Sequence, residues 1–350
     1  MIQFDTEKPT IALFRALQLG DMLCAVPAMR ALRHAFPQAD IALIGLPWAN
    51  TFVQRFNHYL NRHIAFPGYP GLPEQPFSEN GWMTFVTTMQ QEQFDCIIQM
   101  QGNGTIVNQM LQQLYAKQLA GFHRYDCQMD PQFFLEYPEE EHEVMRHLLL
   151  MKHLGVKDEG VQLEFPITEQ EETTLHQVAP FVHDEPYVCI HPGSGSTARQ
   201  WNPCYFAALG DYCAEHGYRV VLTGTPDETW ITDYVANLMT HKPVNLAGKT
   251  GLGVVAALIK RAHLLIADCT GVSHIAAATQ TPSIIISMDG EPHRWAPMNH
   301  SLHHVFDWTN NRSFTEVHNQ LVNLVAMDTK ENTLSKFAVF QSGAMGFIVE

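Results

Sequence analysis

Residues 187–201, "YVCIHPGSGSTARQW", place an apolar, β-branched run directly before a stretch of glycine and hydroxyl side chains. The run is typical of a buried strand, and Gly193 and Gly195 would let the main chain approach a ligand closely. The polar side chains available to an anion follow: Ser194, Ser196, Thr197 and Arg199. Because amides near a helix N-terminus and a forked guanidinium both favour phosphate, this junction predicts a diphosphate site. A flexible surface loop is the alternative.

Strand-like and helix-like segments alternate over most of the chain. Strands are expected at 11–17, 41–45, 96–100, 187–191, 219–224, 244–248, 264–268 and 283–287. Helices are expected at 22–36, 107–118, 203–217, 228–240, 253–262, 271–279 and 313–327. This alternation predicts parallel, doubly wound α/β sheets, whose ligands bind outside the carboxyl ends of the strands. We expect two such ends to face one another across a central cleft.

The alternation stops in the middle of the chain. Residues 137–156 read as one helix, and residues 157–172 are polar and irregular, so we expect a connection around residues 157–184. The predicted organisation is two Rossmann-like domains, 1–165 and 166–327, followed by a tail over 328–350.

Composition excludes several classes of partner. The net charge is −15 and neither half of the chain is basic, which argues against nucleic acid and leaves at most peripheral membrane contact. The seven cysteines form no C-x-x-C pair, and no stretch of about 18 apolar residues occurs, so we expect a cytoplasmic location.

Two further strand-to-helix junctions carry candidate residues. In "LQLGDMLCAVP" (17–27), Asp21 begins a helix after Gly20, and this junction alone favours a simple N-cap. In "ADCTGVSHIAAATQTP" (267–282), four residues surround the start of a helix: Thr270, Gly271, Ser273 and His274. The histidine is either structural or part of a ligand site.

Other motifs are weaker. "HEVMRH" (142–147) resembles a zinc-binding H-E-x-x-H, but its histidines are five residues apart and would point to different helix faces. The G-x-G-x-x-G and G-x-S-x-G motifs are absent. Trp230 and Tyr234, spaced i,i+4, are expected in the core. We predict no metal site.

In their order and spacing, five stretches together resemble glycosyltransferase family 9, the bacterial lipopolysaccharide heptosyltransferases. They are "LQLGDMLCAVPAMRALR" (17–33), "HPGSGSTARQWNPCYFAAL" (191–209), "VVLTGTPDE" (220–228), the stretch from "NLAGKTGL" to "TPSIII" (245–286) and "HRWAP" (293–297). Residues 50–165 match only loosely.

The resemblance implies a GT-B fold, with the acceptor held by the first domain and a nucleotide-sugar donor, ADP-linked, held mainly by the second. It implies inverting transfer without a metal or a cofactor. Asp21 falls on the family's catalytic carboxylate, which favours a general base over the cap. The donor-binding residues implied are Ser194, Ser196, Thr197, Arg199, Glu228 (ribose), Lys249 (near the base), Thr270, Gly271, Ser273 and His274.

Two departures affect what the resemblance implies. Arg199 stands where the family commonly has lysine, and Cys269-Thr270-Gly271 replaces its Asp-[Ser/Thr]-Gly, with Asp268 one position early. The sequence therefore predicts transfer of a heptose or a related sugar to a glycan, lipid-linked or soluble acceptor. A nucleotide-sugar epimerase or hydrolase of the same fold, or a non-catalytic nucleotide-sugar-binding protein, stays open as an alternative.

Overall fold

The computed structural model describes residues 2–326, so the tail over 328–350 lies outside the described residues. The chain forms two compact units. Unit 1 comprises Met1–Pro166 together with His293–Trp295, and unit 2 comprises Ile167–Pro292 and the chain from Ala296 onward. The expected boundary lay one residue earlier, and the sequence did not indicate that a short later segment belongs with the first unit.

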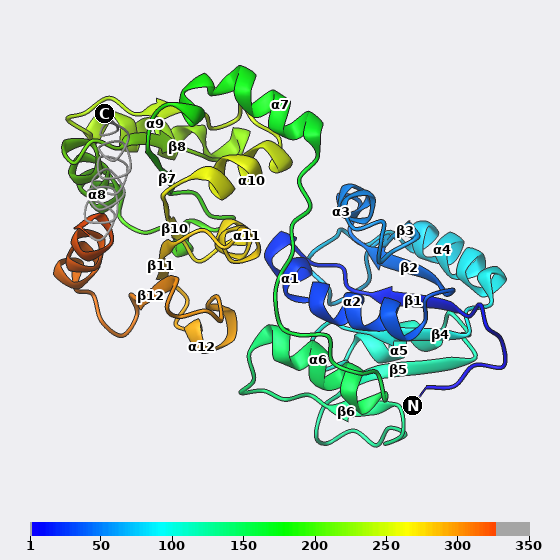
Figure 1. Cartoon of the computed structure of the whole chain (residues 1–350). Coiled ribbons are helices and arrows are strands. Elements are labelled where there is room, and N and C mark those ends of the chain that lie inside the picture. Colours follow the sequence, from blue (N-terminus) through cyan, green and yellow to red (C-terminus); the bar gives the residue numbers. More distant parts are fainter. Residues whose placement is uncertain (1, 327–350) are drawn as a thin grey trace, which may run out of the picture. The chain divides into compact units, whose positions relative to one another are not determined.

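Unit 1 is built on a parallel six-stranded sheet in the order β3-β2-β1-β4-β5-β6 (Figure 1). Its strands are β1 Thr10–Phe14, β2 Asp40–Gly45, β3 Arg62–Ala65, β4 Cys96–Gln99, β5 Gln118–His123 and β6 Phe134–Glu136. Its helices are α1 Leu19–Cys24, α2 Val26–Ala35, α3 Ala49–Arg55, α4 Glu79–Glu92, α5 Val107–Gln112 and α6 Glu143–His153, with α12 Pro292–Trp295 added by the later segment.

Helices cover both faces of this sheet. Alternate strand residues such as Phe14 and Ile44 pack against Trp82 and Phe85 of α4 and against Met110 of α5. The other face is covered by α2 and α6, which pack side by side (Figure 1). Strands buried on both faces read as continuous apolar runs, which explains why β1, β2 and β4 were recognisable in the sequence.

Unit 2 repeats this architecture with a parallel sheet in the order β12-β11-β10-β7-β8-β9. Its strands are β7 Tyr187–His191, β8 Arg219–Leu222, β9 Val244–Asn245, β10 Leu264–Asp268, β11 Ser283–Ser287 and β12 His303–Asp307. Its α-helices are α7 Glu169–Val178, α8 Pro203–Glu215, α9 Thr229–Leu238, α10 Leu252–Arg261, α11 Gly271–Thr279 and a helix over residues 314–326. Short 3₁₀ turns are η1 Pro180–His183, η2 Thr197–Arg199 and η3 Pro226–Glu228.

One face of the second sheet packs on α8, α9 and the helix over residues 314–326. Fully buried Trp201 lies in this core beside Phe206 of α8 and Trp308. Three other helices of unit 2 also pack together, with α10 in contact with both α7 and α11. The small alanines of α11, Ala276 to Ala278, permit this close packing.

Counted along the chain, both sheets have the same strand order, 3-2-1-4-5-6. The order reverses between the first and fourth strands, which are β1 and β4 in unit 1 and β7 and β10 in unit 2. Ligands of doubly wound sheets bind at this switch point, outside the carboxyl ends of the strands. A ligand site is therefore expected in the segments that follow these four strands.

Several expectations about elements were wrong. The helix expected over residues 137–156 is confined to Glu143–His153. The helix expected over residues 107–118 ends at Gln112, because the chain turns there and enters β5 at Gln118. The connection expected around 157–184 contains α7, which a Thr168–Glu171 capping box starts. Trp230 and Tyr234 are 54% and 50% exposed rather than core residues.

Among residues 2–326, the structure has no helix with the length and apolar character needed to cross a bilayer.

Candidate functional site

Asp21 lies in the first turn of α1, directly beyond the carboxyl end of β1. The helix begins after Gln18, which occupies the N-cap position, so Asp21 is not the cap that the junction alone favoured. Its side chain is 26% exposed. Burial is the largest influence on the Asp21 carboxyl and raises its pKa, while Arg15 and Arg294 lower it and Glu143 raises it further. The carboxylate is thus a stronger base than an exposed aspartate and still reaches solvent.

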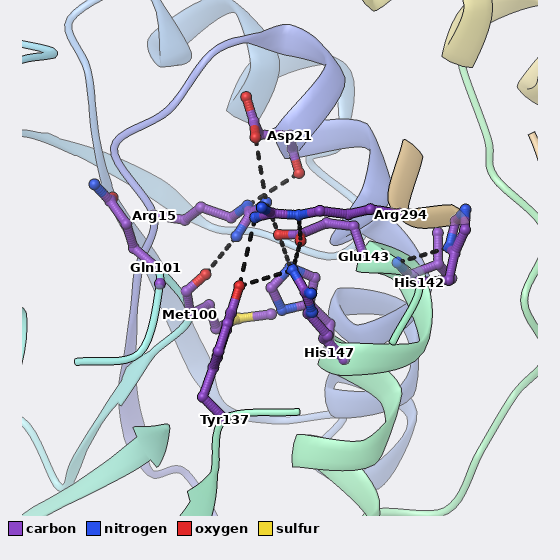
Figure 2. A network of polar contacts seen from close by, with 12 residues as sticks. Arg15, Asp21, Met100, Gln101, Tyr137, His142, Glu143, His147 and Arg294 are labelled. Carbon is purple, nitrogen blue, oxygen red and sulfur yellow. Dashed lines mark hydrogen bonds and ion pairs between the residues drawn. The ribbon is translucent and has the colours of Figure 1, made fainter. Parts of the chain in front are cut away.

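Arg15, which follows β1, lies beneath Asp21 and is fully buried (Figure 2). Its Nε donates to the Asp21 carbonyl at 3.0 Å, and its Nη1 donates to the carbonyl of Met100, just after β4. Its Nη2 donates to Glu143 Oε1 at 2.9 Å and lies 3.9 Å from Asp21 Oδ1. The Gln101 side chain accepts from the Ala16 amide at 2.7 Å. The switch point of unit 1 is therefore fixed by hydrogen bonds from both of its strands.

Glu143, the first residue of α6, is the centre of a buried charged cluster. Its Oε2 accepts from Arg146 Nη1 at 3.0 Å and from Arg294 Nε at 3.1 Å, and His147 Nε2 lies 3.4 Å from Oε1. We call Arg15, Glu143, Arg146, His147 and Arg294 the Glu143 cluster. Although burial opposes ionisation, the surrounding cations and the His147 contact hold the pKa of Glu143 far below its ordinary value.

Arg294 explains why a three-residue segment of the later chain belongs to unit 1. Besides Glu143, it donates to the Tyr137 hydroxyl at 3.4 Å, and Arg146 donates to the same hydroxyl at 2.8 Å (Figure 2). Trp295 packs with the cluster formed by α1 and α6. Burial lowers the pKa of His147 to about 4, so this ring is neutral at pH 7.

In unit 2, the segment after β7 lies over a buried polar pair. His191 Nδ1 is 3.0 Å from the Thr223 hydroxyl, and His191 Nε2 is 3.8 Å from Glu228 Oε2. Glu228 also accepts from the Thr225 amide at 2.7 Å. A Cβ at Gly193 would lie 2.3 Å from the Glu228 carboxyl carbon. A side chain at position 193 would therefore displace the carboxylate of Glu228, predicted to hold the ribose, because this carboxylate packs directly against the loop.

The remaining loop residues are open to solvent. Ser194 is buried, whereas Ser196, at the N-cap of the following 3₁₀ turn, and Thr197 and Arg199 within that turn are exposed. The Arg199 side chain is 56% exposed, and its Nε lies 3.8 Å from Asp289 Oδ2. A guanidinium held this loosely keeps donors for another anion.

The junction after β10 supplies amides and hydroxyls at the same edge of the sheet. Thr270 caps α11 without a side-chain hydrogen bond, and its hydroxyl is buried with no partner within the described part of the chain. Gly271 begins the helix, Ser273 donates to the Thr270 carbonyl at 2.7 Å, and His274 is buried. This junction thus presents a helix N-terminus and an unpaired hydroxyl.

Asp268 and Cys269 have different roles. Both Asp268 oxygens accept from the Trp201 amide, at 3.1 and 3.2 Å, so Asp268 anchors the end of the 192–200 loop to β10. Burial raises the pKa of Asp268 well above its ordinary value. Burial also raises the pKa of the Cys269 thiol to about 12, with Asp289 adding to the effect. Cys269 is therefore neutral and supplies no carboxylate.

Lys249 lies within the segment that connects β9 to α10. Its Nζ donates to the Asn245 carbonyl at 2.8 Å, and the residue is exposed. The neighbouring Thr250 hydroxyl is buried and unpaired among the described residues. The segment after β9 thus offers a cation and a hydroxyl at the carboxyl edge of unit 2.

A protein-family model described as glycosyltransferase family 9 (heptosyltransferase) matches residues 82–323. The chain belongs to glycosyltransferase family 9. Lipopolysaccharide heptosyltransferase 3 of Escherichia coli K12 is 27% identical to it over 281 residues, covering 77% of this chain and 79% of that protein. Lipopolysaccharide core heptosyltransferase OpsX of Haemophilus influenzae is 23% identical over 84% of this chain and 83% of that protein. The predicted family and glycosyltransferase activity are confirmed.

Solved structures confirm the predicted GT-B fold. E. coli ADP-heptose lps heptosyltransferase II aligns with a TM-score of 0.68 at 17% identity, over 92% of this chain and 99% of that one. A family 9 glycosyltransferase from Veillonella parvula aligns with a TM-score of 0.72 at 19% identity, over 86% of each chain.

Several polar residues of this family 9 enzyme escaped sequence analysis. Glu143 was noticed only as part of a failed zinc motif, and Arg15, Arg294 and Asp289 were not singled out. The available signal was a charged residue within or close to an expected apolar strand. Arg15 lies within the strand expected over residues 11–17, and Asp289 lies two residues after the strand expected over 283–287. Among residues 2–326, no group of three or more His, Cys, Asp or Glu side chains could hold a metal ion. Metal independence stays a prediction.

Proposed function

We propose that this glycosyltransferase transfers a heptose from ADP-heptose to a hydroxyl of a lipopolysaccharide core, with inversion and without a metal ion. The names of its relatives support the donor and the acceptor. The observation that carries the mechanism is Asp21, a partly exposed carboxylate with a raised pKa at the switch point of unit 1. We also propose a cytoplasmic location, which the seven free cysteines support.

In the proposed reaction, Asp21 accepts the proton of the acceptor hydroxyl. The acceptor oxygen bonds to the anomeric carbon while the bond from that carbon to the diphosphate oxygen breaks, and ADP leaves as an anion. Attack opposite the leaving group inverts the configuration. A raised pKa brings the carboxylate closer to the strength that general-base catalysis at neutral pH requires.

Unit 2 supplies the groups for the donor in this proposal. Arg199 and the amides at the start of α11 would stabilise the negative charge of the departing diphosphate, with the unpaired Thr270 hydroxyl as a further donor. The Glu228 carboxylate beside Gly193 would accept from the ribose hydroxyls. Lys249 would border the nucleobase.

The test is a transfer assay with the full chain, ADP-heptose and a lipopolysaccharide core that lacks heptose. We expect ADP release, an acceptor heavier by one heptose, an inverted anomeric centre by NMR, and unchanged rates with EDTA. A ligand at about 100 times its dissociation constant stabilises a protein by roughly 2.7 kcal/mol, so a thermal screen of nucleotide sugars checks the donor independently.

Three results would contradict the proposal. Stabilisation and transfer with UDP-, GDP- or CMP-sugars but not ADP-heptose would show that the donor is wrong. Consumption of the donor without an acceptor would favour the hydrolase or epimerase alternative. Tight donor binding with no turnover would favour a binding protein.

A further inference from the structure

We propose that Glu143 is a positioning residue for Asp21, which it serves by holding Arg15 in a fixed orientation and competing with Asp21 for the Arg15 guanidinium. This inference rests on the proposed role of Asp21 as the base. Glu143 lies on α6, more than a hundred residues after Asp21 in the sequence, and the two side chains are connected through Arg15 (Figure 2).

The first argument is the geometry of Arg15. Each of its three nitrogens has a partner: the Asp21 carbonyl, the Met100 carbonyl and Glu143 Oε1. The Glu143 oxygen is at hydrogen-bond distance, 2.9 Å, whereas the Asp21 carboxylate is at 3.9 Å. Glu143 therefore takes the charge-assisted hydrogen bond of Arg15, and the Asp21 carboxylate is left available to a substrate hydroxyl.

The second argument is that Glu143 itself is held rigidly. Arg146 and Arg294 donate to its second oxygen, and its side chain is only 4% exposed. The guanidinium of Arg15 is fully buried, so neither partner can be replaced by bulk water. A buried carboxylate with such contacts orients the group it binds, because moving it would leave buried cations unpaired.

The third argument is the balance of charge around Asp21. The charged groups that act on its carboxylate come from three elements: Arg15 after β1, Glu143 on α6 and Arg294 on α12. His147 is neutral above about pH 4, and burial raises the pKa of Tyr137, so neither contributes charge near pH 7. Without the Glu143 charge, the charged groups acting on the Asp21 carboxylate would be two guanidinium groups, those of Arg15 and Arg294.

The loss of Glu143 should therefore have two consequences. Arg15 would turn toward the Asp21 carboxylate and pair with it, which displaces the base and lowers its proton affinity. The loss of Arg294 should have the opposite electrostatic effect, since this cation lowers the Asp21 pKa. A purely structural role for Glu143 predicts no shift in the first case, whereas the Arg294 shift calibrates how strongly a neighbouring charge acts on Asp21.

The experiment compares Glu143→Gln, Arg294→Gln and Arg146→Gln in the full chain. Arg146 is the matched control, because it contacts the same Glu143 oxygen as Arg294 and is not among the groups that act on Asp21. The measurements are the pH profile of kcat at saturating donor and acceptor, the donor Kd, and the titration of the Asp21 carboxyl by ¹³C NMR, which needs no substrate.

For Glu143→Gln, we expect the acidic limb and the Asp21 titration to move to lower pH. We also expect kcat to fall roughly 10- to 100-fold, as misplacement of a catalytic group by about 1 Å does, with an unchanged donor Kd. For Arg294→Gln, the acidic limb of the kcat profile and the Asp21 titration should both move to higher pH. For Arg146→Gln, we expect a lower melting temperature with both curves in the wild-type position.

Wild-type titration curves in folded Glu143→Gln and Arg294→Gln would overturn the inference, as would a shift of both in the same direction. If Glu143→Gln does not fold, Glu143→Asp takes its place, because it keeps the negative charge and withdraws the carboxylate from Arg15; kcat should then fall, and a wild-type kcat in the folded variant would overturn the inference. Asp21→Asn separates this inference from the proposed function. If that variant keeps wild-type turnover, the base assignment fails. If it is inactive while no curve shifts, only the role of Glu143 fails.

Discussion

The two switch points hold their charges differently. In unit 1, the guanidinium groups of Arg15 and Arg146 are buried. They donate hydrogen bonds of 2.8–3.0 Å to the Asp21 carbonyl, the Glu143 carboxylate and the Tyr137 hydroxyl. In unit 2, Arg199 is more than half exposed and lies 3.8 Å from Asp289. A cation with buried partners is a fixed part of the protein, whereas an exposed and loosely paired one can exchange its partner for a ligand. This difference supports the proposals that the buried arginines of unit 1 orient the Asp21 side chain and that Arg199 of unit 2 binds the diphosphate of the donor.

The largest expected effect comes from Asp21→Asn in unit 1. General-base catalysis typically contributes about 10²–10⁴-fold, so we expect kcat to fall by roughly that factor. Because Gln18 and not Asp21 is the N-cap, the melting temperature should change little. Steady-state kinetics and a donor titration check this, and the donor Kd should be unchanged. Wild-type turnover would show that Asp21 is not the base. The buried arginines of unit 1 would then have no catalytic side chain to orient.

The next effect is on ligand binding in unit 2. Hydrogen bonds to charged groups contribute about 1.5–3 kcal/mol, so Arg199→Ala should weaken ADP binding by roughly 10- to 100-fold. Arg219→Ala is the matched control, because Arg219 also pairs with a carboxylate, Glu185, but begins β8 and so lies at the opposite edge of the sheet. Calorimetric titration measures both. Equal affinities for wild type and Arg199→Ala would mean that the exposed cation does not receive the diphosphate.

A smaller effect, on the free energy of unfolding, is expected from substitutions in the glycine-containing loop after β7. Gly193→Ala would place a Cβ against the Glu228 carboxylate, and such overpacking costs typically about 1–3 kcal/mol. Gly195 is the control, because a Cβ there would meet nothing within 4 Å. Urea unfolding should show a loss for the first variant and a change within about 0.5 kcal/mol for the second. Equal stabilities would contradict the close approach of Glu228 to the loop.

The fold was largely predictable because buried parallel strands are apolar along their whole length. β1, β7, β10 and β11 were all recognised by this signal. The strands that were missed are short or polar, such as β3 "RHIA" and β12 "HHVFD". Pairing with a neighbouring strand, rather than their own composition, places these segments in the sheets.

The site was predictable only in part, for a related reason. Residues in the segments that follow recognised strands, such as Asp21 and Arg199, could be found because the sheet brings strand ends to one edge. Glu143 and Arg294 reach the same place from α6 and α12, and no local pattern indicates a contact across 151 positions of sequence. Arg15 lies inside the strand expected over residues 11–17, and its place beyond the carboxyl end of β1 follows only from the observed end of that strand at Phe14.

The smallest expected effect concerns α9, where the sequence-based interpretation was wrong. Trp230 and Tyr234 are half exposed, whereas Ile231 and Val235, one position later, are buried. One residue rotates a helix by about 100°, so two stripes with the same i,i+4 spacing point in different directions, and spacing alone cannot select the buried one. Trp230→Ser should change the free energy of unfolding by no more than about 0.5 kcal/mol, whereas the control Ile231→Ala should cost about 2–5 kcal/mol. A large loss of unfolding free energy for Trp230→Ser would place the tryptophan in the core. The face of α9 that packs on the sheet would then be the one with Trp230 and Tyr234, and not the one with Ile231 and Val235.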